Sequence, residues 1–187
     1  NPPLDAQTRA ALARAFAVAG SWRFFHWPLE FPDAFYGAGR TLEDPGFDVV
    51  VTNPPWERAK LQENEFFARR SQEIALAPTA AERKRRIAAL KETGPALWAQ
   101  YEEAKARADG LLEYLHGSGE FPLMGRGDTN LYAVFVERAV ALTRRAGRCA
   151  LVVPSGIATD KTTSAFFRKM VEEKRLGLLL DFETVRP

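Results

Sequence analysis

A six-residue stretch that is apolar or β-branched at five positions, followed by Asn53 and two prolines, constrains this chain most. Residues 47–52 read Phe-Asp-Val-Val-Val-Thr, and β-branched valines fit a pleated surface buried on both faces. We therefore expect a central strand of a parallel sheet. Asn53-Pro54-Pro55-Trp56 follows at once, and proline has no N–H to give to a ladder and disfavours helix in the residue before it. The pattern predicts a stiff loop at the carboxyl end of a strand, where open α/β sheets bind ligands.

This loop presents hydrogen-bond acceptors beside a large aromatic ring. The Asn53 side-chain oxygen and the Pro54 carbonyl can accept the two N–H bonds of a planar exocyclic amine. Pro55 stiffens the loop, and Trp56 can stack on the ring that carries the amine. Because these acceptors do not remove a proton, the nitrogen keeps lone-pair character for attack on an electrophile. The alternative interpretation is a proline-rich turn with Trp56 in the core.

The sequence Asn53-Pro54-Pro55-Trp56 resembles motif IV of the amino-methyltransferases, the N-P-P-aromatic loop of the DNA adenine-N6 methylases. The resemblance implies S-adenosylmethionine as the methyl donor and double-stranded DNA as the partner, with the target adenine flipped out of the duplex. It assigns all four residues to the catalytic loop and places Asn53 at the cofactor as well. The stretch 25–32 and the segments 127–132 and 153–160 are similar to the large restriction-modification and phage-exclusion adenine methylases.

A second N-P-P sequence, Asn1-Pro2-Pro3, has no strand before it and no aromatic residue after it. We interpret it as the entry to a helix and assign it no chemistry.

Composition is that of a soluble globular protein. The chain is 46% hydrophobic and 27% charged, and its 187 residues are enough for one domain with a sizeable core. No apolar run of membrane-spanning length and no signal peptide is evident, so we expect no membrane partner and a cytoplasmic location. The formal net charge is only +2, so DNA contacts would come from local clusters.

Three residues that often serve chemistry are interpreted here as structural. Cys149, the single cysteine, lies in a predicted strand, where we expect an inert buried thiol. His26 and His116 are far apart and have no ligand-like neighbours, so we expect packing roles and no metal site.

Periodicity and breaker residues predict the other elements. We expect helices at 4–19, 57–76, 79–92, 96–115, 131–145 and 159–174, and strands at 22–27, 148–153 and 176–182. Thr79 and Glu82 fit a capping box, Gly94-Pro95 separates two helices, and Asp128 or Thr129 can cap the helix that starts at 131.

The order of elements predicts an α/β fold, the second half of a doubly wound sheet with right-handed crossovers. It matches the Rossmann-like class I methyltransferase core from motif IV onward, with 57–116 as a helical insertion and 1–187 as part of one catalytic domain. In the insertion, Arg83-Lys84-Arg85-Arg86 is either a solvated helix face or a phosphate contact.

The glycine-rich cofactor loop and the acidic ribose ligand of this family have no counterpart before residue 20, and Gly125-Arg126-Gly127 lacks the dinucleotide-binding spacing. We therefore expect a fragment of a larger enzyme, without the N-terminal core strands and the target-recognition domain, and inactive alone. A permuted motif order is the alternative. Two other functions stay open: an RNA or protein-glutamine amino-methyltransferase, and a non-catalytic interaction domain with the same fold. An uncovered sheet edge would also invite dimerisation.

Overall fold

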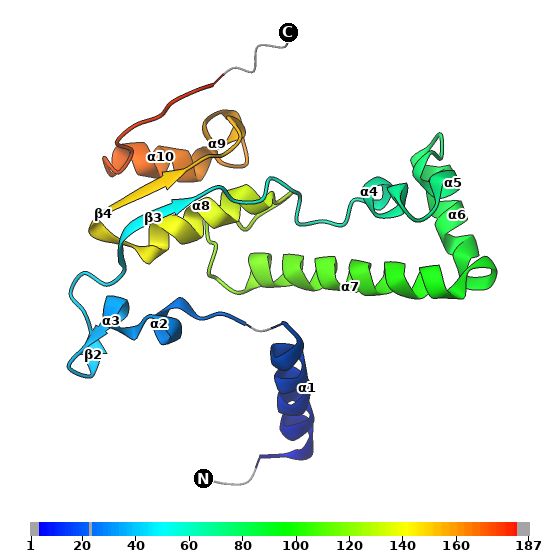
Figure 1. The fold of residues 1–187 in the computed structure, drawn as a ribbon, viewed down its shortest axis with the longest axis horizontal. Coiled ribbons are helices and arrows are strands. Elements are labelled where there is room, and N and C mark those ends of the chain that lie inside the picture. The colour runs from blue at the N-terminus through cyan, green and yellow to red at the C-terminus, as the bar shows by residue number, and fades with distance from the viewer. Residues whose placement is uncertain (1–3, 23, 183–187) are drawn as a thin grey trace.

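The computed structural model describes residues 4–22 and 24–182. Figure 1 shows a sheet part, which carries the C-terminal helices, and a long helical arm. The elements are α1 (Ala6–Trp22), α2 (Trp27–Glu30), α3 (Pro32–Phe35), β1 (Tyr36–Gly37), β2 (Arg40–Thr41), β3 (Phe47–Thr52), α4 (Glu63–Ala68), α5 (Gln72–Ala75), α6 (Ala80–Thr93), α7 (Pro95–Gly117), α8 (Leu131–Leu142), β4 (Thr143–Leu151), α9 (Gly156–Thr159) and α10 (Ser164–Glu172).

The predicted strand at 47–52 is confirmed as β3, and it pairs in parallel with β4. The register runs from Val49 opposite Arg148 to Thr52 opposite Leu151. This parallel pair among helices confirms an α/β fold. The antiparallel pair β1 and β2 forms a separate, very short hairpin.

The junction between α8 and β4 differs from the prediction. The helix ends at Leu142 instead of Arg145, and the strand begins at Thr143 with a register shift before Arg148. Asp44 accepts the backbone N–H of Arg145 at 2.7 Å, which holds this stretch out of the helix. A Cβ on Gly147 would lie 2.8 Å from the carbonyl oxygens of Phe47 and Asp48, so the close approach of the two strands requires glycine there.

The predicted strand at 176–182 is wrong. These residues leave α10 through Lys174, whose φ is 55°, and they form no ladder with any described strand. Leu178 and Phe182 are 75% and 84% exposed. An apolar run becomes a strand only when its backbone groups find a paired neighbour, and no described segment supplies one.

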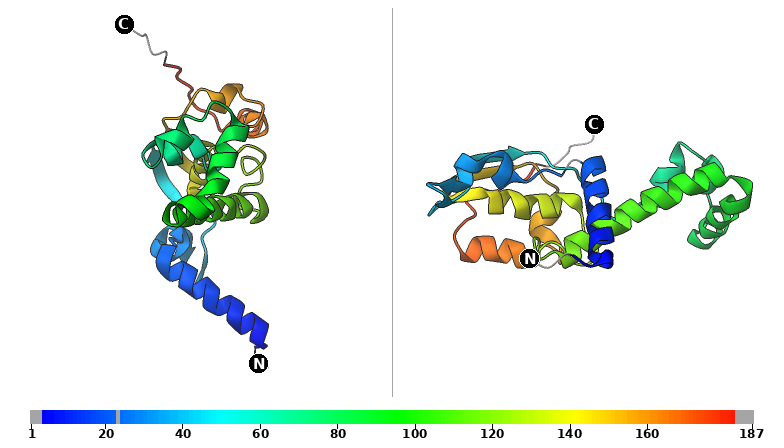
Figure 2. Two further views of the ribbon diagram at one scale, coloured as in Figure 1. Left: turned by 90° about the vertical axis from the view of Figure 1, so that its right-hand side faces the viewer. Right: turned by 90° about the horizontal axis from the view of Figure 1, so that it is seen from below.

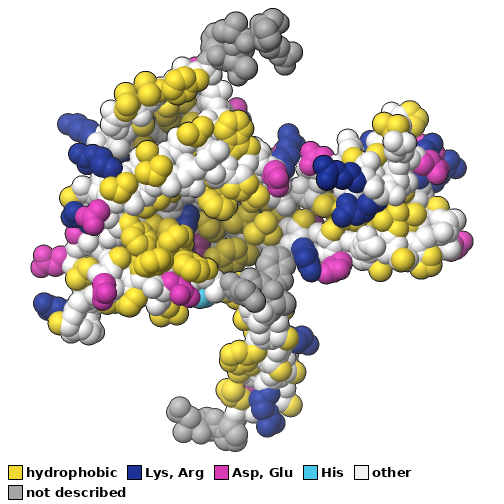
Figure 3. Space-filling view, viewed as in Figure 1, with side chains coloured by type: hydrophobic (Ala, Val, Ile, Leu, Met, Phe, Trp, Pro, Cys, Tyr) yellow, Lys and Arg dark blue, Asp and Glu magenta, His cyan; other side chains and the backbone are white. Residues whose placement is uncertain are grey.

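One face of the parallel pair is covered, and the other is open. Figure 2 shows α8 and α10 on the same side of the strands. Their shared core joins β4 to buried residues of α8, α9 and α10, including Val134, Val136, Ile157, Phe166 and Met170. On the opposite face Val49, Val51 and Val152 are 61%, 73% and 62% exposed. In Figure 3 hydrophobic side chains gather over the sheet part, whereas charges of both signs lie along the arm.

The arm consists of α4 to α7 and has a core of its own around Phe67, Ile74, Ile87 and Tyr101. One local prediction is confirmed here: the Gly94-Pro95 pair separates α6 from α7. The capping box is confirmed in part: Thr79 Oγ1 accepts the backbone N–H of Glu82 at 3.1 Å, but the Glu82 carboxylate binds Arg85 and Arg86 instead of the Thr79 N–H. Residues 57–76 are helical only in the two short stretches α4 and α5.

In the N-terminal part, the predicted strand at 22–27 is wrong. Residues 22 and 24–27 are not a strand, and residue 23 lies outside the described residues. Helix α1 continues through Gly20 to Trp22, and α2 begins at Trp27, with proline in its first turn. Proline at the start of a helix needs no N–H partner, so Pro28 favours the helix. Trp27 and Phe31 then pack on Phe47, with ring centroids 5.6 and 5.4 Å away. Residues 1–3, with the second N-P-P, lie outside the described residues.

Among the described residues, every helix is too short or too polar to cross a lipid bilayer.

Candidate functional site

The Asn53–Trp56 loop begins where the parallel pairing ends. The Thr52 carbonyl accepts the N–H of Val152 at 3.2 Å, and the chain then leaves the sheet. Pro54 is buried, whereas Asn53, Pro55 and Trp56 are exposed. Pro54 therefore anchors the loop, while the other three residues lie at the surface.

Residues just after the loop are fixed to the start of α8. The Glu57 carbonyl accepts the N–H of Leu131 at 2.8 Å, and the Ala59 N–H donates to the Thr129 carbonyl at 2.9 Å. Arg58 lies between them and contacts Asp128 at 2.9 Å. Both ends of the loop are thus held by backbone hydrogen bonds, so its conformation is largely preorganised.

The side chains of Asn53 and Trp56 are accessible. Trp56 is 54% exposed and makes no ring contact with any described residue. The alternative of a core tryptophan is therefore wrong. The Asn53 side chain has no hydrogen bond to the described residues, so its amide oxygen remains available as an acceptor.

Two other stretches that the sequence singled out lie beside this loop. Residues 127–132 reach it through the bonds to 57–59, and 153–160 continue from β4, the partner of β3. They also approach each other, since a Cβ on Gly156 would lie 3.0 Å from the Tyr132 hydroxyl. Burial and the charge of Asp160 raise the pKa of Tyr132, so its hydroxyl stays protonated.

The predicted N-cap of α8 is wrong, because the two candidate residues, Asp128 and Thr129, make other contacts. Asn130 occupies the N-cap position and makes no side-chain cap bond. Asp128 pairs with Arg58, while Thr129 Oγ1 lies 3.1 Å from His116 Nε2 at the end of α7. Sequence reasoning missed this arrangement, because Arg58 and Asp128 are 70 positions apart and no local pattern joins them.

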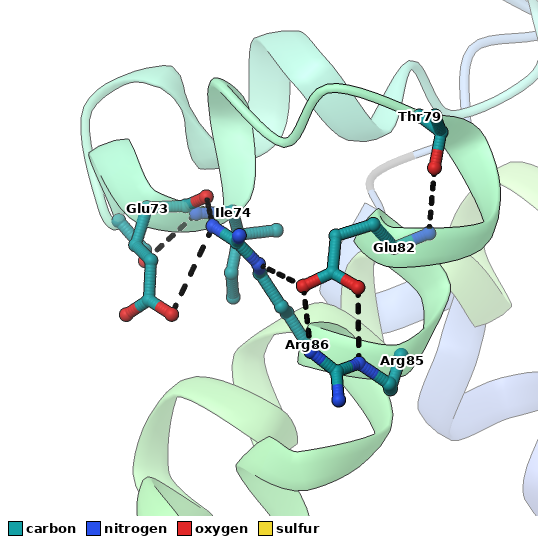
Figure 4. A network of polar contacts seen from close by, with 7 residues as sticks. Glu73, Ile74, Thr79, Glu82, Arg85 and Arg86 are labelled. Atoms are coloured by element: carbon teal, nitrogen blue, oxygen red, sulfur yellow. Dashed lines mark hydrogen bonds and ion pairs between the residues drawn. The ribbon is translucent and has the colours of Figure 1, made fainter.

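Half of the basic cluster of α6 is engaged in contacts within the arm. Figure 4 shows Glu82 between Arg85 and Arg86, which approach its carboxylate at 2.8 Å. Hydrogen bonds from Arg85 and then Arg86 lower the pKa of Glu82 to about 2. Arg86 also donates to the Glu73 carbonyl at 2.6 Å. Two of the four cations therefore serve the fold.

Cys149 and His26, the remaining candidate functional residues, lie in environments typical of residues with a packing role. Cys149 is half buried in β4, and burial raises the pKa of its thiol, which disfavours the reactive thiolate. His26 is the N-cap residue of α2, and its carbonyl accepts N–H groups of Leu29 and Glu30. Within 4–22 and 24–182, no three His, Cys, Asp or Glu side chains converge as metal ligands do.

These residues do not by themselves fit a pocket for S-adenosylmethionine. Asn53 is the residue that the sequence assigns to the cofactor, and a single exposed amide does not enclose a nucleoside. The glycine turn at 37–39 joins the two-residue strands β1 and β2, so it does not open a helix, as a cofactor loop requires.

Comparison with known proteins gives one family. No curated protein and no solved structure matches the chain. Residues 104–186 match the model of the Eco57I restriction-modification methylase. The matched stretch includes the second half of α7 and continues through α8, β4, α9 and α10, and it begins after Trp56. The match supports a methyltransferase of the restriction-modification methylase type.

Proposed function

We propose that this chain forms the acceptor-binding part of an S-adenosylmethionine-dependent DNA adenine-N6 methyltransferase. Its parent would be a large cytoplasmic restriction-modification or phage-defence enzyme. The observation that carries the proposal is the placement of Asn53 and Trp56, both exposed on a loop fixed at each end beside a parallel strand. The family match at 104–186 supports methyl transfer independently of this loop.

In this proposal β3 and β4 belong to a doubly wound methyltransferase sheet, and 57–116 is its helical insertion. The Asn53 amide oxygen and the Pro54 carbonyl accept the two N–H bonds of a flipped adenine amine. Trp56 stacks on the base, and Pro55 limits the movement of the loop. S-adenosylmethionine supplies the methyl group when it is bound. The residues described here orient the amine and keep its lone pair available.

The first experiment uses the larger parent enzyme that the sequence predicts. Asn53→Ala should lower methyl transfer to DNA by about 10²–10³-fold, because it removes an acceptor that acts as charge develops on the amine. DNA binding should stay nearly unchanged. Parallel assays on RNA and on protein substrates separate the proposed activity from the other amino-methyltransferases. Normal methylation of DNA by Asn53→Ala would contradict the assignment.

Trp56 provides the second variant pair. Trp56→Ala should weaken capture of the flipped base by about 1–3 kcal/mol, whereas Trp56→Phe should keep much of the activity because it retains a ring face. Phe16→Ala is the matched control, since Phe16 is a 74% exposed ring on α1. A large fall in the melting temperature of Trp56→Ala would instead indicate a structural role.

For the 187-residue chain alone we expect weak or no binding of S-adenosylmethionine. Calorimetric titration checks this, and micromolar binding would mean that residues not assigned here build the donor pocket.

A further inference from the structure

An open cavity of about 370 Å³ lies at the base of the arm, next to the Asn53–Trp56 loop. Residues from three parts of the chain line it: Arg58, Lys60 and Gln62 after the loop, Leu112 of α7, and Gly127, Asp128 and Thr129 before α8. The functions proposed so far do not use this cavity. It is large enough for a small polar group, and five of its seven lining residues have polar or charged side chains.

The charges around this cavity leave one cation uncompensated. Arg58 and Asp128 are 2.9 Å apart, so their charges offset each other. Lys60 is exposed and forms no ion pair with any described residue. The lining therefore has a net charge of +1, from two cations and one anion, and it favours an anionic ligand.

Neutral donors accompany this charge. Gly127 and Asp128 are exposed, and neither backbone N–H donates a hydrogen bond to a described residue. Gly127 has a φ of 67°, a left-handed conformation that suits glycine. Consecutive free N–H groups in such turns often bind anions.

The wall of the cavity is held in place. Thr129 is 3% exposed, its carbonyl accepts from Ala59, and its hydroxyl contacts His116. Gln62 donates its amide N–H to the Lys60 carbonyl at 2.9 Å, which fixes the turn that carries the lysine. A ligand would thus meet a site whose backbone is already arranged.

The short distance between the cavity and the loop indicates which kind of anion would bind there. Lys60 follows Trp56 by four residues, so their Cα atoms are at most about 14 Å apart. A nucleotide flipped onto Trp56 brings its own sugar–phosphate backbone to this edge of the protein. Contacts to phosphate oxygens fix the position of a protein on DNA without reading sequence.

We propose that this cavity binds a backbone phosphodiester of DNA beside the flipped nucleotide, with Lys60 as the main charge contact and the N–H groups of Gly127 and Asp128 as further donors. The proposal rests on the function proposed above, and it assigns the phosphate contact to this cavity rather than to the cluster 83–86. In that cluster Arg85 and Arg86 already bind Glu82.

The test measures the affinity of the parent enzyme for a short labelled duplex over a series of salt concentrations. Lys60→Ala should weaken binding and reduce the slope of log affinity against log salt by about 0.9, the value for one lost phosphate contact on B-DNA. Lys60→Arg should restore most of the slope. Over a series of DNA concentrations, Lys60→Ala should raise KM for DNA by a larger factor than it lowers kcat, because this contact lies outside the reacting groups.

Lys84→Ala is the matched control, since Lys84 is an exposed lysine in the α6 cluster with no ion pair to a described residue. It should leave the slope unchanged. An altered slope for Lys84→Ala together with a normal slope for Lys60→Ala would overturn the proposal, as would equal salt dependence of Lys60→Ala and wild type. If the wild type methylates DNA under those conditions, the cavity assignment alone fails. If it neither binds nor methylates DNA, the proposed function fails with it.

Discussion

The arm and the sheet part bury their apolar side chains in different ways. In the arm, Phe67 is completely buried, and the rings of Phe66 and Tyr101 lie 4.9 and 5.4 Å from it. In the sheet part, Val51 of β3 pairs with Ala150 of β4, and yet it is 73% exposed. The arm is thus packed around its own core, whereas the sheet is packed on one face. An apolar run such as that of β3 therefore predicts a strand, but it does not predict how many faces of that strand are covered.

Phe67→Ala should have the largest effect on the stability of the arm. Removing a fully buried ring leaves a cavity, and we expect a loss of about 3–5 kcal/mol in the free energy of unfolding of the arm. Hydrogen exchange should report the loss in α4 to α7 and leave α8 largely unchanged. Val51→Ala in β3 is the control, and it should change stability by about 0.5 kcal/mol or less if its face is as open as it is here. Similar losses for the two variants would show that the two parts are not packed differently.

Glu137→Gln examines the covered side of the sheet part. Glu137 is 8% exposed in α8, and its two carboxylate oxygens accept the backbone N–H groups of Leu123 and Met124 at 3.1 and 2.8 Å. An amide places a donor against one of these N–H groups, so we expect a loss of about 1.5–3 kcal/mol in chemical denaturation.

The control for that variant is Glu120→Gln, which removes an exposed carboxylate that pairs with Arg138 at 2.8 Å. Its loss should be at most about 1 kcal/mol. A larger loss for Glu120→Gln than for Glu137→Gln would contradict the ranking of buried over exposed carboxylates.

Thr79→Ala tests the N-cap of α6 in the arm. It removes the acceptor for the Glu82 N–H at the first turn of α6, and the expected loss is about 1 kcal/mol. Thr79→Ser should retain stability, since serine offers the same hydroxyl. Circular dichroism melts of the two variants decide, and equal losses would mean that the methyl group rather than the hydroxyl matters.

The smallest effect concerns pH. The folded pKa of Glu82 is about 2, against an ordinary value of 4.5, because Arg85 and Arg86 bind its carboxylate. Its contribution to stability is therefore present above about pH 4.5 and is lost as the pH falls toward 2. NMR titration of the Glu82 carboxyl should show the low midpoint, and Arg85→Gln should raise it. A midpoint near 4.5 in the wild type would mean that the contacts in Figure 4 do not persist in solution.

Predictions from sequence succeeded where the cause is local. Three valines followed by two prolines define β3 and its end, and Thr79 and Gly94 act within a few residues of their own positions. The failures depend on distant partners. Residues 176–182 have the composition of a strand and no described neighbour to pair with. Helix α8 ends early because Asp44, about a hundred positions away, takes the N–H of Arg145.

The same division holds for the candidate site. Asn53 and Trp56 could be singled out from the sequence, because residue type and order alone define an acceptor beside a ring. The Arg58–Asp128 pair and the contact of His116 with Thr129 could not, since folding brings these residues together across long separations. The Lys60 cavity follows from those contacts, so it too emerges only in three dimensions.

The length of α7 gives the arm the mechanics of a lever. Its 23 residues span about 34 Å at 1.5 Å per residue, and the end nearest the sheet carries His116. A tilt of about 10° at that end would therefore displace the far end by about 6 Å. In the opposite direction, a partner that moved the tip by about 6 Å would turn the base by about 10°. That small rotation would pass through His116 and Thr129 to the residues that follow Trp56.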